Sequence, residues 1–150
     1  MVSTQASDDA TLEVASRLRL AIARTARRLR QSSGTDLTAA LTAALATVEA
    51  RGPLTPSALA SVEHVKRPTA TRIVARLEEQ GLVERTADPG DRRSFLVEIT
   101  ADGRALLRRL RKRKNAYLAR RLRELEAEDV ATLERAAGVL EHLLETEPRA

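Results

Sequence analysis

The chain of 150 residues contains no cysteine and no tryptophan, and its aromatic residues are one phenylalanine and one tyrosine. Without thiols it cannot form a disulfide, a thiolate nucleophile, a thiol redox switch or a cysteine-ligated zinc site. Its longest stretch free of charged residues, 37–48, has twelve residues, whereas a membrane-spanning helix needs about 18. Residues 1–9 have neither the basic segment nor the apolar run of a secretory signal. We therefore expect a cytoplasmic protein that does not associate with membranes.

Signatures of catalysis and of cofactor binding are also missing from the sequence. His64 and His142 are its only histidines, and neither belongs to a metal-ligand spacing such as H-E-x-x-H. The chain has no glycine-rich phosphate loop and no nucleophile elbow. Carboxylates are numerous, but they are spread along predicted helix surfaces, where ion pairing explains them. The sequence therefore predicts no enzyme activity, no cofactor and no metal site.

What the chain has in excess is arginine. Its 26 lysines and arginines exceed its 21 acidic residues by 5, and subtracting the three lysines leaves 23 arginines. Arginine matches phosphate oxygens and guanine edges better than lysine does. A coding bias toward arginine and alanine would produce the same excess, so composition permits nucleic acid as a partner without establishing it. The length, with 43% apolar residues, predicts a single domain over 1–150.

Hydrophobic periodicity and capping residues predict six helices. Their expected ranges are 12–30, 38–51, 56–62, 68–80, 101–125 and a last helix that begins near 126–129. Thr38, Thr55 and Thr100 are expected to cap the second, third and fifth helices, and Pro68 fits the first turn of the fourth. Glycines mark two helix ends: Gly52, expected in the left-handed cap conformation, and Gly81.

Between residues 82 and 99 the hydrophobic period changes from 3.6 to 2, which predicts a β-hairpin of strands 82–86 and 95–99. The connector 87–93 is rich in turn formers and ends in two arginines. The preceding helix, 68–80, has an apolar stripe at 70, 73, 74 and 77, which places Arg72 and Arg76 on the opposite side. This order of elements predicts a mainly α fold with a small β-wing, a winged helix-turn-helix, whose outward helix fits the major groove of DNA.

The long helices at the two ends have apolar faces without an obvious partner in so small a core. In the helix 101–125 the expected apolar track begins at Leu106 and Leu110, and the last helix carries Val130, Leu133, Ala137 and Leu140. Pairing of two subunits would cover these faces. We therefore expect a homodimer.

Over residues 54–103 the sequence resembles the MarR family of bacterial transcription regulators. The resemblance rests on Asp91-Arg92-Arg93 followed by Val97-Glu98-Ile99-Thr100 and Gly103, and on the matching stretch from 67 to 83. It implies a winged helix-turn-helix lobe at 36–100, flanked by dimerisation helices at 10–33 and 101–147. It also implies an obligate homodimer that binds a near-palindromic site on double-stranded DNA.

The resemblance also implies roles for individual residues. Arg93 corresponds to the wing arginine that enters the minor groove, with Arg92 beside it and Asp91 bracing the hairpin. The implied base-reading set is Arg67, Pro68, Thr69, Thr71, Arg72 and Arg76. Thr55 and Ser57 would offer hydroxyls or helix-start amides to phosphate. Helix capping alone also explains Thr55, and a solvated helix surface is the alternative for the arginines at 72 and 76.

Members of this family often respond to small lipophilic or phenolic anions, so the resemblance implies a ligand-responsive repressor. Arg113 and Lys114 interrupt the apolar track before Tyr117, and either could face a cavity and bind an anion. A solvated helix face is the preferred explanation of the basic run 104–114, and a phosphate-flanking surface is a second alternative to anion binding. Tyr117 fits a core or interface position. With so few aromatics, the pocket of a lipophilic or anionic effector must be mainly aliphatic. The lack of cysteine excludes the thiol-peroxide sensing of one branch of the family.

Two further functions compete with a sequence-specific regulator. A helical protein-interaction or scaffold protein would have a neutral or acidic outward face on the helix 68–80, which Arg72 and Arg76 contradict. A non-specific DNA-binding protein would need only base-indifferent contacts. Comparing its binding to random DNA and to the promoter beside its own gene separates that function from a regulator.

Overall fold

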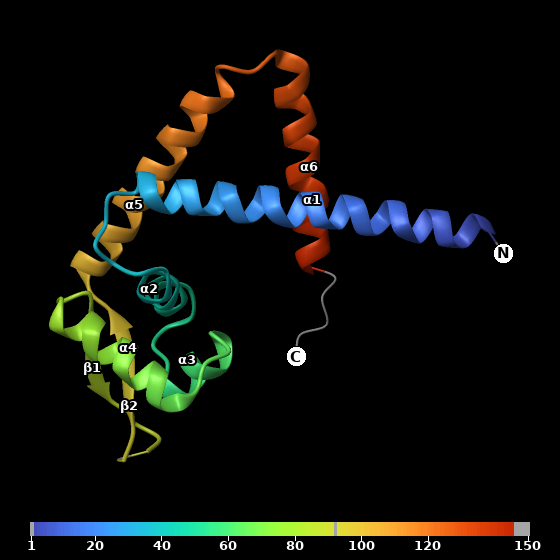
Figure 1. Ribbon diagram of the computed structural model, residues 1–150. Coiled ribbons are helices and arrows are strands. Elements are labelled where there is room, and N and C mark those ends of the chain that lie inside the picture. Colours follow the sequence, from blue (N-terminus) through green and yellow to red (C-terminus); the bar gives the residue numbers. More distant parts are fainter. Residues whose placement is uncertain (1, 92, 146–150) are drawn as a thin grey trace. The chain divides into compact units, whose positions relative to one another are not determined.

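The computed structural model describes residues 2–91 and 93–145, with side chains described from Asp8 onward. It is mainly helical with one two-stranded sheet, which confirms the predicted fold class (Figure 1). The chain divides into two compact units, Met1–Lys114 and Asn115–Ala150. Each unit is described by itself.

The first unit contains the elements of a winged helix-turn-helix. In chain order these are α1 (Val2–Ser32), α2 (Ala39–Arg51), α3 (Pro56–Val62), α4 (Arg67–Glu79), β1 (Val83–Ala87), β2 (Phe95–Ile99) and the start of α5 (Ala101–Leu122). α1 begins ten residues before the predicted position 12. The prediction followed apolar periodicity, which starts at Leu12, but residues 2–11 contain no glycine or proline to stop a helix.

Threonine side chains cap three of these helices, as the sequence predicts. The Oγ1 atoms of Thr38, Thr55 and Thr100 accept hydrogen bonds from the backbone N–H three residues later, at 3.3, 3.1 and 3.1 Å. Each bond satisfies an N–H that has no partner within its own helix. Thr100 also donates to the carbonyl oxygen of Gly81 at 2.7 Å, so this cap connects α5 to the end of α4.

The prediction that Gly52 takes the left-handed cap conformation is wrong. Gly81, the other glycine at a predicted helix end, is left-handed with φ +69°. Gly52 has φ −72° and ψ 164°, which is extended backbone that any residue can adopt. Glycine is required here for lack of space, because a Cβ at position 52 would lie 2.5 Å from the carbonyl oxygen of Val48. Its N–H donates to that same oxygen at 2.9 Å, and this contact ends α2.

The two strands form an antiparallel hairpin in which Val83 pairs with Ile99 and Ala87 with Phe95. Leu54, just before α3, adds an isolated bridge to Val97 through hydrogen bonds of 3.2 and 2.8 Å. The hairpin is therefore joined by backbone bonds to the segment that begins the helix-turn-helix.

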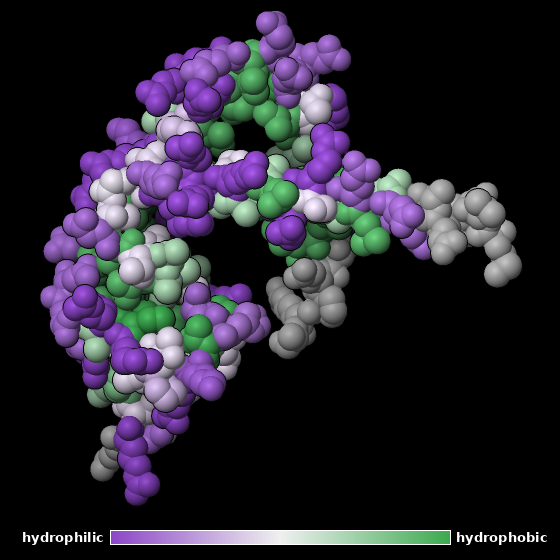
Figure 2. Space-filling view, in the orientation of Figure 1, coloured by the Kyte–Doolittle hydropathy of each residue, from purple (hydrophilic) through white to green (hydrophobic). Residues whose placement is uncertain are grey.

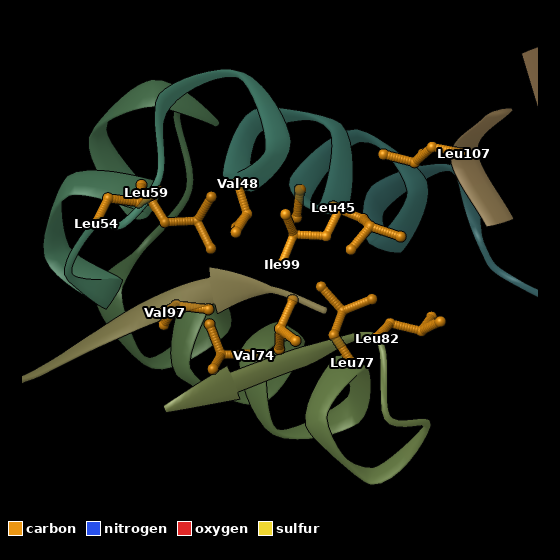
Figure 3. Packing of buried hydrophobic residues seen from close by; sticks show 12 residues of the cluster. Leu45, Val48, Leu54, Leu59, Val74, Leu77, Leu82, Val97, Ile99 and Leu107 are labelled. Atoms are coloured by element: carbon orange, nitrogen blue, oxygen red, sulfur yellow. The ribbon is translucent and has the colours of Figure 1, made fainter. Parts of the chain in front are cut away.

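The core of the first unit lies between α2, α4 and the hairpin (Figure 3). Leu45 from α2, Val74 and Leu77 from α4 and Val97 from β2 are all fully buried. Fully burying one such side chain contributes roughly 1.5–3 kcal/mol, so this stripe fixes which face of α4 points inward. α5 contributes Leu107, which is 3% exposed, although the predicted apolar track began at its neighbour Leu106.

The second unit consists of the remainder of α5 and α6 (Ala127–Glu145). None of the nineteen described residues of α6 is buried. Large apolar side chains are also exposed along α1, where Figure 2 shows green patches between purple ones. No helix in the described part of the chain combines the length and apolar character needed to cross a membrane.

Candidate nucleic-acid interface

The core stripe of α4 determines which of its side chains face outward. Ala70, Val74 and Leu77 are fully buried, which confirms the predicted inward face. Arg72 and Arg76, one helical turn apart, are exposed on the other side. Arg72 has no hydrogen bond or ion pair with any described residue, and Arg76 reaches only Glu79 at 3.5 Å, with both side chains about two-thirds exposed. Such a pair contributes little, so both guanidinium groups are available to a ligand.

The start of α4 and the start of α3 hold the other expected contact residues. Arg67 and Pro68 are exposed, and Thr69 is half-buried. The Thr71 hydroxyl donates to the carbonyl oxygen of Arg67 at 3.1 Å, a bond that leaves its oxygen free to accept. In α3, Thr55 is engaged as the N-cap, and Ser57 is half-buried in the first turn.

The connection between α3 and α4 is a tight turn of a helix-turn-helix. His64 lies in it with φ +51°, a left-handed conformation that few residues other than glycine adopt. The Val65 N–H donates to the carbonyl oxygen of Ala60 at 3.0 Å, which closes the end of α3. This turn sets the angle at which α4 leaves α3.

The tip of the hairpin is organised by two aspartates. The Asp88 carboxylate accepts from the Gly90 N–H, and the Asp91 carboxylate accepts from the Arg93 N–H, both at 2.9 Å. The Ser94 N–H donates to the Asp91 carbonyl at 2.9 Å. Asp91 thus fixes the backbone that carries Arg93, whose side chain is exposed. Arg92 lies outside the described residues.

In Figure 1 the hairpin lies beside α4, and its tip projects past the helix. The exposed face of α4 and the tip of the wing are therefore parts of one framework, built on the same core.

One contact in this framework was not found from the sequence. Arg85 of β1 pairs with Glu78 of α4 through Nε and Oε2 at 2.8 Å, and its guanidinium carbon lies 4.4 Å from the centre of the Phe95 ring. The predicted hairpin could have indicated the contact between Arg85 and Phe95, because its strand pairing puts these two residues on one face.

The three candidate effector ligands lie in different surroundings. Nη1 of Arg113 donates to the carbonyl oxygens of Ser33 and Gly34, at 2.9 and 3.1 Å, at the C-terminal end of α1. Lys114 lines a cavity of about 520 Å³ within the first unit, together with Leu29, Leu37 and Ala46. Tyr117 belongs to the second unit, where the guanidinium of Arg120 lies 5.9 Å from its ring centre.

Across the described residues, no three side chains of the histidine, cysteine, aspartate or glutamate type come together as a group that could hold a metal ion. The chemistry of the exposed α4 face and wing is that of guanidinium and hydroxyl groups, which bind phosphates and base edges.

Comparison with known proteins agrees with this geometry. The model of the MarR family matches residues 37–95. The chain is 33% identical over 141 residues to an uncharacterized HTH-type transcriptional regulator of Mycobacterium leprae, with 93% of this chain and 99% of the relative covered. It is 36% identical over 100 residues to the multiple antibiotic resistance protein MarR of Salmonella typhimurium, with 66% and 69% covered.

A solved structure of the apo form of MarR from Escherichia coli superimposes on the chain with a TM-score of 0.69 and 29% identity. The superposition covers 84% of this chain and 95% of that one. Both the sequence and the fold thus match along most of the length. The chain belongs to the MarR family and is a DNA-binding transcription regulator with a winged helix fold.

Proposed function

We propose that the chain is a ligand-responsive repressor that binds a near-palindromic DNA site as a homodimer. The observation that carries this proposal is the exposed arginine face of α4, held by a fully buried stripe beside a wing whose tip presents Arg93. α4 would lie in the major groove, with Arg72 and Arg76 toward base edges, and Arg93 would enter the minor groove. The starts of α3 and α4 would contact phosphates.

The first experiment identifies the site and tests the residues. Duplexes selected from a random pool provide the ligand, and fluorescence anisotropy measures the affinity of each variant. Arg72→Ala should cost about 1–3 kcal/mol and relax the preference at particular bases. Arg93→Ala should weaken binding to many sequences while the protein stays folded. Arg135→Ala, an exposed arginine of α6, is the matched control, and equal affinity for all three variants would refute this interface.

The proposed homodimer is supported by apolar side chains that a lone chain leaves in water. Leu12 and Val14 of α1 are 68% and 61% exposed, and Val139 of α6 is 62% exposed. Soluble chains rarely leave so many large apolar residues on successive turns without a partner. A second copy would cover them with the same surface patch, because a two-fold interface uses one patch on both subunits. Sedimentation should give a dimer for the parent chain and a monomer for Val14→Glu or Val139→Glu. The control Glu134→Gln should remain a dimer. A monomeric parent chain would overturn the assignment.

The proposed effector site is the cavity beside Lys114. Its lining is mainly aliphatic, and Lys114 and Arg30 supply positive charge. This composition suits a small anion with an apolar tail. Octanoate should raise the thermal midpoint of the parent chain and weaken its binding to the selected duplex. Lys114→Ala should abolish both effects, and Lys112→Ala, an exposed neighbour, should keep them. Equal responses of the two variants would refute this site.

A sequence-independent DNA-binding protein is the alternative that the same arginines allow. The random-pool selection decides between the two, because such a protein would enrich no sequence. The repressor assignment is tested by a reporter gene behind the selected site, whose expression should fall with the protein present and recover with Arg93→Ala.

A further inference from the structure

Arg85 connects three elements of the winged helix. Its Nε donates to the carboxylate of Glu78, in the last turn of α4, at 2.8 Å. Its guanidinium carbon lies over the ring of Phe95, the first residue of β2, 4.4 Å from the ring centre. Arg85 itself belongs to β1. One side chain therefore links the end of the outward helix to both strands of the wing.

The pairing of the hairpin explains this arrangement. Arg85 is opposite Val97 and Ala87 is opposite Phe95, so Arg85 and Phe95 are diagonal neighbours on one face of the ladder. A guanidinium is planar and can stack on a ring while its edge donates to a carboxylate. A lysine ammonium has the same charge but neither the plane nor the fixed donor direction.

Few residues in the outer half of the wing are buried. In β1 only Val83 is buried, and residues 84–87 are all exposed. In β2 the buried residues are Val97 and Ile99, on the half of the strand nearest α5. The buried core therefore holds mainly the base of the hairpin. In the outer half, Phe95 packs partly buried against that core, and Arg85, which lies over Phe95, pairs with Glu78 of α4.

We infer that Arg85 is a positioning residue, which holds the outer half of the wing against α4 so that the wing tip and the α4 arginines contact one duplex together. This inference rests on the proposed DNA interface. Two sets of contacts on one rigid body bind cooperatively, because ordering one of them prearranges the other. A loosened wing would have to be ordered at each binding event, which we expect to weaken DNA binding roughly tenfold.

A direct phosphate contact by Arg85 is the competing role, and two variants separate the two roles. Glu78→Gln removes the acidic partner and leaves the cation in place. If Arg85 positions the wing, this change weakens binding; if it contacts phosphate, binding stays equal or tightens. Arg85→Lys keeps the charge and loses the stacking plane. Because lysine also matches phosphate less well, this variant separates the two roles through hydrogen exchange of the DNA-free protein, which changes only in the positioning role. Glu84→Gln, an exposed acid of the same strand, is the control.

The experiment measures anisotropy of the full chain on the selected duplex for Glu78→Gln, Arg85→Lys, Arg85→Ala, Arg93→Ala and the double variant Arg85→Ala/Arg93→Ala. The expected result is a roughly tenfold loss for Glu78→Gln and for Arg85→Lys. Arg93→Ala should cost less in the Arg85→Ala background than alone, because its contact is already poorly placed. Without DNA, amide hydrogen exchange of the segment 84–97 should be faster in Arg85→Lys and unchanged in Glu84→Gln.

The inference is overturned if Glu78→Gln and Arg85→Lys bind as the parent does, or if the losses from Arg85→Ala and Arg93→Ala simply add. Failure of the proposed interface looks different, because then Arg72→Ala and Arg93→Ala alone leave the affinity unchanged. In that case the exchange measurement still decides whether Arg85 restrains the hairpin, and a rate equal to that of the parent removes the restraint as well.

Discussion

Replacing Gly103 with alanine should destabilise the protein, although alanine is the better helix former. Gly103 lies buried in the first turn of α5. A Cβ at this position would lie 2.2 Å from the carbonyl oxygen of Leu82 and 2.7 Å from Cγ1 of Ile99. The Leu82 oxygen already accepts a hydrogen bond from the Thr100 N–H at 3.1 Å, so rotating it away would break that bond.

The magnitude follows from two opposing effects. Alanine stabilises a helix by up to about 1 kcal/mol relative to glycine. Overpacking a close contact costs about 1–3 kcal/mol, and the upper end applies here because the nearest atom is backbone, which cannot change rotamer. Relief would require α5 to move away from the hairpin, and Ile99 and Leu107, each 3% exposed, would lose packing. The net expected loss is about 2 kcal/mol.

Urea unfolding followed by circular dichroism measures this loss. The protomer concentration must be equal for all variants, because the stability of a proposed homodimer depends on it. Arg104→Ala is the matched control: the position is adjacent and exposed, and its free energy of unfolding should change by less than about 0.5 kcal/mol. If Gly103→Ala were as stable as the parent chain, α5 would not approach the base of the hairpin as closely as the structure has it.

Three further perturbations follow from the same structure. Gly34→Ala should cost more in urea unfolding than Gly81→Ala, although both glycines have a positive φ worth about 1–2 kcal/mol each. Only at Gly34 would the new Cβ displace a neighbour, Arg113 Nη1 at 2.9 Å, from its hydrogen bonds to two backbone carbonyl oxygens. Equal losses would contradict this. Thr38→Ala should lower the free energy of unfolding by about 1 kcal/mol and Thr100→Ala by about twice that, because the Thr100 hydroxyl also bonds the Gly81 carbonyl. Urea unfolding that gives the reverse order would contradict this. For DNA binding, the slope of log affinity against log salt concentration should be steep. Arg93→Ala should make it shallower by roughly 0.9 for each phosphate contact that the variant removes, whereas Arg135→Ala should leave it unchanged.

Local chemistry explains why so much of the winged helix could be predicted. A cap needs only a threonine three residues before a helical N–H, so Thr38, Thr55 and Thr100 were identifiable from sequence. The buried face of α4 follows from spacing alone. Gly52 was mispredicted because glycine is compatible both with a left-handed cap and with a close backbone approach, and only the position of the Val48 carbonyl selects the second. The early start of α1 carried no periodic signal.

Arg113 shows where prediction from sequence stops. A cation within an apolar track needs a negative partner, and sequence offered a bound anion as the candidate. A backbone carbonyl oxygen is a strong acceptor, and those that follow the end of a helix are not used by a helical ladder, so they satisfy a guanidinium as an anion would. Arg113 bonds two such oxygens, at Ser33 and Gly34, about 80 positions earlier in the chain. Nothing local distinguishes these partners. The adjacent Lys114 makes no such hydrogen bond within the described residues and lines the cavity instead, so it is the cation that we propose for an anionic effector.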